Sequence, residues 1–147
     1  MTYWRALTQV KGENMSATKL QLQILTSESA KVDELVDMVI MRCTSGDIGI
    51  LPGHLPLSAV LEISPLRIIN DGEERLMAVF GGVVNVKDDA VTILTELAEW
   101  PEDIDLARAE NAFEEASAAY EDLPHNKMAE RRAKVRLEVG VTLAGRR

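Results

Sequence analysis

Few side chains in this 147-residue chain could do chemistry, and their spacing argues against a catalytic centre. Histidine can act as a general base or bind a metal, but His54 and His125 have no cysteine or second histidine at ligand spacing. The one cysteine, Cys43, lies in a mainly apolar run and is expected to be a small buried residue rather than a nucleophile. No Gly-x-x-x-x-Gly-Lys sequence is present to hold a nucleotide phosphate. The sequence therefore predicts no catalytic residue, no metal site and no enzyme activity.

Residues 46–57 form the most constrained stretch of the sequence. They contain three glycines and two prolines and still keep five large aliphatic side chains. Glycine permits positive φ and proline fixes φ at about −65°, so the backbone is tightly specified here. A loop that served only as a solvated connection would not need the aliphatic residues. We therefore expect this stretch, which includes Asp47 and His54, to have a defined structure.

The first part of the chain has the patterning of short strands. From residue 19 to about 99, apolar and polar residues mostly alternate, and turn signals at 70–72, 81–82 and 88–89 separate the apolar runs. Gly81-Gly82 also lies inside a strand pattern, where a glycine pair marks a bulge or a close backbone approach. Aromatic residues make up only 4% of the chain, so the core must be aliphatic. We predict an antiparallel β-sandwich or barrel over residues 18–100.

Pro101 ends the strand pattern, and residues 101–147 are predicted to form an antiparallel two-helix hairpin. Asp103 is the expected N-cap of the first helix, with Asp105 in its first turn. Apolar residues then recur at spacings of three and four, which predicts one buried stripe on this helix. The residues of this stripe are Leu106, Ala109, Phe113, Ala116 and Tyr120.

The second helix is less clearly specified. Aliphatic residues alternate from Val135 to Leu143, which by pattern alone indicates a strand, and Gly140 would weaken a helix interior. A helical stripe of mostly small residues favours a helix that approaches the first one closely. We predict the helix, with its stripe formed by Ala129, Ala133, Leu137, Gly140 and Ala144.

Charge supports the pairing of the two helices. Residues 102–122 hold eight acids and one base, whereas residues 127–147 hold seven bases and two acids. Each exposed ion pair contributes only a few tenths of a kcal/mol. A hairpin held by small residues and weak ion pairs is predicted to detach from its neighbours easily.

Composition excludes several classes of protein. The net charge of −8 argues against a nucleic-acid partner, because such proteins carry a basic surface. A single cysteine allows no intrachain disulfide and indicates a reducing compartment. No window approaches the roughly 20 apolar residues of a membrane-spanning helix. Residues 1–17 are predicted to be a disordered N-terminal extension, and we assign them no function.

Three segments resemble the ε subunit of F-type ATP synthases, in the order and at the distances found in that family. They are residues 46–57 with their Pro-Gly-His sequence, residues 80–86 (Phe-Gly-Gly-Val-Val-Asn-Val) and residues 102–109 (Glu-Asp-Ile-Asp-Leu-Ala-Arg-Ala). The resemblance covers about residues 18–144. It implies a β-sandwich followed by a helical hairpin, in the central stalk of a proton-transporting rotary motor.

The resemblance also implies partners and a location. In this family the sandwich binds the γ subunit and rests on the membrane ring of c subunits, while catalysis occurs on the β subunits beside α. The hairpin folds onto the sandwich or extends into the catalytic head, where it blocks ATP hydrolysis. No cofactor is required. The chain would be peripheral on the cytoplasmic face of the bacterial plasma membrane, held there by the complex. The mitochondrial equivalent is disfavoured because no transit segment is visible, whereas the chloroplast equivalent is harder to exclude.

Two residues match family positions near the polar loops of the c ring, namely Asp47 and His54. For each of them a local role stands as the alternative. His54 could hydrogen-bond its own turn, and Asp47 could be an acid of the turn at residues 45–47.

Another set of residues matches a motif through which some bacterial ε subunits bind ATP as a regulatory ligand. Arginine presents a fork of donors suited to phosphate oxygens. One departure weakens the match, because Glu115 replaces an arginine expected near the phosphates. The alternative is that Asp105 and Arg108 form a local pair that stabilises the start of the helix. The matching residues are Glu99, Ile104, Asp105, Arg108, Ala109, Arg132 and Arg136.

A function of a different class also fits these features. The chain could be a nucleotide-sensing adaptor module that is not part of a rotary motor. Binding to a γ subunit would separate this alternative from the rotor subunit.

Overall fold

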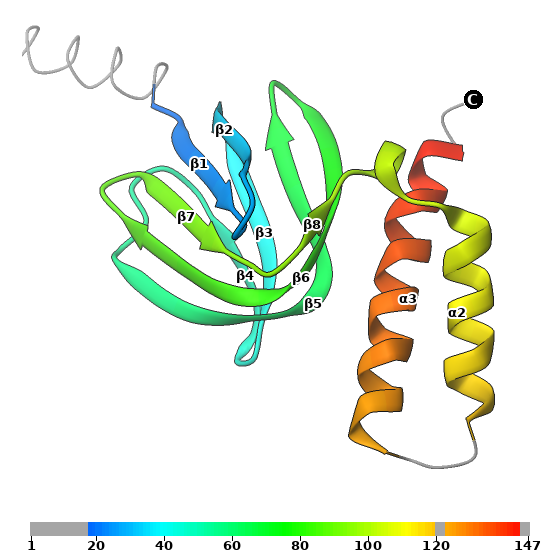
Figure 1. Ribbon diagram of the computed structural model, residues 1–147. Coiled ribbons are helices and arrows are strands. Elements are labelled where there is room, and N and C mark those ends of the chain that lie inside the picture. Colours follow the sequence, from blue (N-terminus) through cyan, green and yellow to red (C-terminus); the bar gives the residue numbers. More distant parts are fainter. Residues whose placement is uncertain (1–17, 120–122, 145–147) are drawn as a thin grey trace, which may run out of the picture.

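The computed structural model describes residues 18–119 and 123–144, and within them strands come first and helices last (Figure 1). The expected extension at residues 1–17 and Tyr120 of the expected stripe lie outside the described residues. The strands are β1 (Leu20–Leu25), β2 (Ala30–Val36), β3 (Met38–Cys43), β4 (Gly46–Ile50), β5 (Leu57–Asn70), β6 (Glu73–Lys87), β7 (Ala90–Leu94) and β8 (Ala98–Glu99). The helices are the 3-10 helix η1 (Pro101–Asp103) and the α-helices α2 (Leu106–Ala118) and α3 (Pro124–Ala144).

The strands form one bent sheet in the order β2-β1-β7-β6-β5-β3-β4, with β8 paired to β6. The predicted turns at 70–72 and 88–89 are confirmed. Asp71 and Gly72 join β5 to β6, and Asp88 and Asp89 join β6 to β7, all four with positive φ as type I′ hairpin turns require. The predicted sandwich is therefore confirmed, with one departure from antiparallel pairing, because β1 and β7 run parallel.

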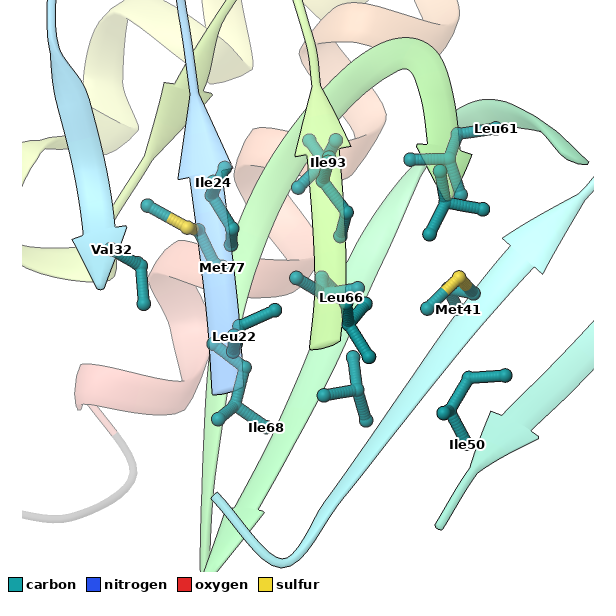
Figure 2. Close-up of a cluster of buried hydrophobic side chains, with 14 of the residues drawn as sticks. Leu22, Ile24, Val32, Met41, Ile50, Leu61, Leu66, Ile68, Met77 and Ile93 are labelled. Carbon is teal, nitrogen blue, oxygen red and sulfur yellow. The ribbon is translucent and has the colours of Figure 1, made fainter. Parts of the chain in front are cut away.

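The sandwich closes around an aliphatic core, part of which Figure 2 shows. Alternation places one face of each strand inside, as in β1, where Leu20, Leu22 and Ile24 are fully buried. Each such side chain contributes about 1.5–3 kcal/mol by leaving water. Cys43 belongs to this core as predicted, and burial raises the pKa of its thiol.

Gly81-Gly82 lies inside the continuous strand β6, so the prediction of a turn there is wrong. The prediction of a close backbone approach is confirmed, because a Cβ atom at Gly82 would lie 2.0 Å from the carbonyl oxygen of Leu94. The strand also changes phase here. Met77 and Val79 face the core before the glycines, whereas Val84 and Val86 face it after them. The glycine pair thus lets one long strand bend, and it exchanges the side of the strand that faces the core.

The hairpin lies against one side of the sandwich, with α3 between β5–β6 and α2 (Figure 1). The predicted stripe of α2 is confirmed within the described residues, since Ala109 is buried and the other three are half-buried. The two-helix architecture predicted from the sequence is also confirmed. The hairpin is therefore folded onto the sandwich rather than extended.

Candidate functional site

The hairpin is joined to the sandwich by an ion pair at the edge of an apolar patch. The Arg136 guanidinium donates to both carboxylate oxygens of Glu99, with Nε–Oε2 and Nη2–Oε1 distances of 2.8 and 3.1 Å. The Arg136 Cζ atom also lies 4.7 Å from the centre of the Phe80 ring, within cation–π range. This bidentate geometry fixes the orientation of α3 on β8 and β6.

The apolar patch beside this pair consists of residues from both parts of the chain. Val135 and Val139 lie one helical turn apart on α3 and are buried against Ala78 and Phe80 of β6. Partly buried side chains at its edge complete the patch: Ile63, Leu76, Leu97 and Ile104. Apolar burial and the ion pair therefore stabilise the docked hairpin together.

A second side of α3 packs against α2. Gly140 approaches α2 so closely that a Cβ atom there would lie 2.5 Å from Leu106 Cδ2. Ala133 is also buried outside the patch. A helix packed on two sides needs apolar residues at more positions than a single stripe provides. The predicted stripe is wrong at Ala129, which is exposed.

Asp105, not Asp103, is the N-cap of α2. Pro101–Asp103 forms η1 and Ile104 is extended, so helical geometry begins only at Leu106. The Asp105 carboxylate accepts a hydrogen bond from the Arg108 backbone N–H at 3.1 Å. This observation favours the local structural interpretation of the Asp105 and Arg108 positions. The prediction of Asp103 as the cap failed because the sequence does not reveal the preceding 3-10 turn.

The remaining residues of the nucleotide motif are spread over the start of α2 and the face of α3. Ala109 is buried in α2, whereas Arg108 and Glu115 are exposed on it. Arg132 lies 3.6 Å from the carboxylate of Glu96. Two arginines of α3 are therefore paired with acids of the sandwich.

Asp47 is paired across the β3–β4 hairpin. The Arg42 guanidinium donates to both of its oxygens, at 2.8 and 3.3 Å. This hydrogen bonding, with the adjacent positive charge, holds the pKa of Asp47 below its ordinary value. Asp47 also lines an open cleft of about 290 Å³ together with Arg67 and with Glu138 of α3. Asp47 thus stands at one end of β4, and His54 follows the other end.

His54 closes a tight turn that begins at Leu51. Its backbone N–H donates to the Leu51 carbonyl at 3.1 Å, with Pro52 and Gly53 between them and Gly53 at φ +84°. These are the positions that proline and glycine take in a type II turn. The His54 ring also bonds within the loop, since Nδ1 lies 2.7 Å from the carbonyl oxygen of Leu55. A carbonyl only accepts, so Nδ1 carries the proton and Nε2 remains to meet other groups.

No metal centre forms among residues 18–119 and 123–144, where no three histidine, cysteine, aspartate or glutamate side chains gather to hold an ion. In the same part of the chain, neither α-helix is long and apolar enough to cross a bilayer.

Comparison with known proteins assigns the family. The model of the ATP synthase delta/epsilon chain β-sandwich domain matches residues 19–101, which is more than half of the chain. The chain belongs to the ATP synthase epsilon chain family. The epsilon chain of Streptomyces avermitilis is 39% identical over 122 residues, covering 82% of this chain and 94% of that relative. The epsilon chain of Bacillus subtilis is 44% identical over 97 residues, covering 66% and 74%.

Solved structures agree on the fold of this epsilon-family chain. A chain in the Euglena gracilis mitochondrial ATP synthase (OSCP/F1/c-ring) superposes with a TM-score of 0.64 at 23% identity, covering 87% of this chain and 81% of that one. A chain in the central stalk and c-ring structure of the Tetrahymena thermophila enzyme gives a TM-score of 0.55 at 17% identity, covering 86% and 96%.

The sequence patterns missed one surface of this epsilon-family chain. Strand pairing places four aliphatic side chains side by side on the outer face of β1, β7, β6 and β5. Three of them are about half exposed, at 47–52% of their surface. We call this set the outer apolar row: Leu25, Leu94, Val83 and Val60. Its only signal in the sequence is a doubled aliphatic, as in Val83-Val84, where one side chain enters the core and the other points out.

Proposed function

We propose that this chain is a non-catalytic central-stalk subunit of a bacterial proton-transporting F-type ATP synthase. Its sandwich would join the γ subunit to the c ring and so couple rotation to catalysis. The outer apolar row carries this proposal. In a chain with 27% charged residues, the row and the neighbouring row of paired residues carry no charge at all. The neighbouring row consists of Gln23, Thr92, Asn85 and Ser58.

An uncharged face of this kind is suited to a protein partner. The two rows border a shallow hollow of about 370 Å³. Exposed apolar side chains rimmed by amides and hydroxyls are typical of interaction surfaces. We assign this face to the γ subunit.

The loop of residues 51–56 supports contact with the c ring. It carries Leu51 and Leu55, both well exposed, with Leu55 at 79%. The His54 Nε2 atom adds a polar group that can meet a partner. Together with Asp47 near the start of β4, these residues are the proposed contact with the c ring. Attachment to the cytoplasmic face of the plasma membrane would then be indirect, through the complex.

Placing a charge in the outer apolar row should remove binding to γ. Val83 lies between Val60 and Leu94, so Val83→Asp would bury a carboxylate in the interface at a cost of about 3 kcal/mol. We expect the dissociation constant for the γ subunit of the same organism to rise roughly 100-fold in a calorimetric titration. The control is Val141→Asp, because Val141 is equally exposed but lies on α3.

The two alternatives give different results in this titration. A rotor subunit binds γ. Its Val141→Asp variant should then have a dissociation constant for γ within about twofold of that of the unaltered chain, and its Val83→Asp variant should bind γ far more weakly. A nucleotide-sensing adaptor outside a rotary motor would not bind γ in any form. Equal binding by both variants would remove the outer row from the proposed interface.

We further propose that the hairpin restrains ATP hydrolysis when it leaves the sandwich. Its docking depends on a small apolar patch around two buried valines and on ion pairs that are partly open to water. In the closer pair, 30% of the Arg136 side chain and 21% of the Glu99 side chain are exposed. Such a contact can be broken by a few kcal/mol. The released hairpin could then extend along γ to the α and β subunits.

ATP is a candidate regulatory ligand of the docked hairpin. Arg132 and Arg136 lie one turn apart on α3, as two groups that bind phosphates should. Both are already paired with acids, at 3.6 Å for Glu96 and 2.8 Å for Glu99. A nucleotide must displace these acids and also meet the negative charge of Glu115. We therefore propose that ATP binds weakly and in competition with Glu99.

Removing the charge of Glu99 should strengthen this binding. We expect calorimetry to give a dissociation constant in the millimolar range for the unaltered chain, and one about tenfold lower for Glu99→Gln. Arg108→Ala is the control, and it should weaken binding if the triphosphate reaches the start of α2. Absence of saturable heat at about 10 mM ATP, in both the unaltered chain and Glu99→Gln, would exclude a nucleotide site.

A further inference from the structure

One carboxylate ties the exposed loop of residues 51–56 to a distant turn. The Oδ1 atom of Asp89 accepts a hydrogen bond from the Gly53 backbone N–H at 2.6 Å, across 36 residues of sequence. Asp89 is itself held in the sheet, because its carbonyl accepts from the Gln21 N–H at 2.8 Å. The loop is thus attached to the sandwich through a residue that the sandwich fixes.

Asp89 occupies a backbone conformation that glycine would adopt more easily. It and Asp88 form the β6–β7 turn, with φ of +60° and +50°. Type I′ turns favour asparagine, aspartate or glycine at the first of these positions and glycine at the second, which is residue 89. Glycine at residue 89 would relieve the strain but would lose the carboxylate. A strained residue of this kind indicates a role beyond the turn.

The hydrogen bond of Asp89 provides an acceptor for a backbone N–H group that the loop itself does not pair. In a type II turn, the N–H of the third residue is not used by the turn, and here that residue is Gly53. The turn provides the bond from His54 N–H to Leu51, and the His54 ring bonds to Leu55. The Asp89 carboxylate adds a bond that leaves the loop and anchors it.

We infer that Asp89 is a positioning residue that presets the loop of residues 51–56 for docking. This inference rests on the proposed function for its consequence, since the loop is the proposed contact with the c ring. A loop ordered before binding loses less conformational freedom when it docks. Asp88 offers a matched comparison, because its backbone also has positive φ but its carboxylate has no hydrogen bond or ion pair in the described part of the chain.

Amide hydrogen exchange of the full chain, read by NMR at single residues, tests the anchor. We expect Asp89→Gly to speed exchange of the Gly53 amide about tenfold while thermal stability stays the same or rises. Asp89→Asn keeps an acceptor oxygen and should restore slow exchange. Asp88→Gly should relieve strain without changing Gly53. An Asp89→Gly variant with unchanged Gly53 exchange would overturn the inference.

A second measurement tests the consequence for docking. Membranes stripped of their own copy of this chain are titrated with each variant, and proton-driven ATP synthesis is recorded. About tenfold more of the Asp89→Gly variant than of the unaltered chain should be needed to restore half of the ATP synthesis. The Asp88→Gly variant should be needed in the same amount as the unaltered chain. If Asp89→Gly restores ATP synthesis at the same amount as the unaltered chain, the docking role is overturned. If the unaltered chain restores nothing, the proposed function fails, while hydrogen exchange still decides whether Asp89 anchors the loop.

Discussion

Val139→Asp is expected to release the hairpin from the sandwich while leaving the sandwich folded. Val139 is fully buried between α3 and β6, in the patch with Ala78 and Phe80. An unpaired carboxylate there would cost several kcal/mol, which exceeds what the small patch can offset. Hydrogen-exchange mass spectrometry should show protection of α3 falling at least tenfold, with β1 and β7 unchanged.

Val141→Asp is the matched control for this release. It introduces the same charge two residues further along α3, at a side chain that is 57% exposed. We expect its exchange pattern to equal that of the unaltered chain. If Val139→Asp also keeps α3 protected, the apolar patch does not hold the hairpin, and docking must rest on the ion pairs of Arg136 with Glu99 and of Arg132 with Glu96.

Gly82→Ala is expected to be the most destabilising glycine-to-alanine substitution in the chain. Its Cβ atom would lie 2.0 Å from the Leu94 carbonyl oxygen, and the backbone there has φ +115°. Neither β6 nor β7 can move without breaking their ladder. Overpacking and backbone strain together predict a loss of roughly 3–5 kcal/mol, measured by urea denaturation of the full chain.

Gly46→Ala separates the two causes of this loss. Gly46 has a similar φ of +123°, but a Cβ atom there would meet nothing within 4 Å. We expect it to cost only the backbone strain, about 1–2 kcal/mol. Equal losses for the two variants would mean that φ, and not the approach of Leu94, explains why residue 82 is glycine.

The bend at Gly81-Gly82 explains how one pair of strands serves two surfaces. The part of β6 before the glycines carries Ala78 and Phe80, which lie under the hairpin. The part after them carries Val83 of the outer apolar row. The sites proposed for regulation and for rotor assembly are therefore built on the same two long strands, β5 and β6.

Local patterns were sufficient to predict much of the fold. The alternation of β1 and the turn at Asp88-Asp89 depend on neighbours in sequence, and the stripe of α2 follows from helical spacing. Each could be predicted because one face of the element is buried and the other is solvated. The strand-like pattern of α3 misleads because its alternating aliphatic residues do not share one environment, since Val139 is buried against the sheet whereas Val141 is exposed.

The features that were missed depend on distant parts of the chain. Glu99 and Arg136 are 37 residues apart, and their pairing appears only once the hairpin is docked. The outer apolar row needs the register of four strands, which no single strand reveals. The bond from Gly53 to Asp89 likewise joins two loops whose sequences carry no common signal.

Affinity purification of the tagged full chain from gently solubilised membranes of its own organism tests the central proposal most directly. We expect the γ and c subunits to be recovered in fixed proportion with the chain, together with α and β. We expect Val83→Asp to lose them and Val141→Asp to keep them. Recovery of the unaltered chain without γ would contradict a role in the central stalk and would favour the adaptor.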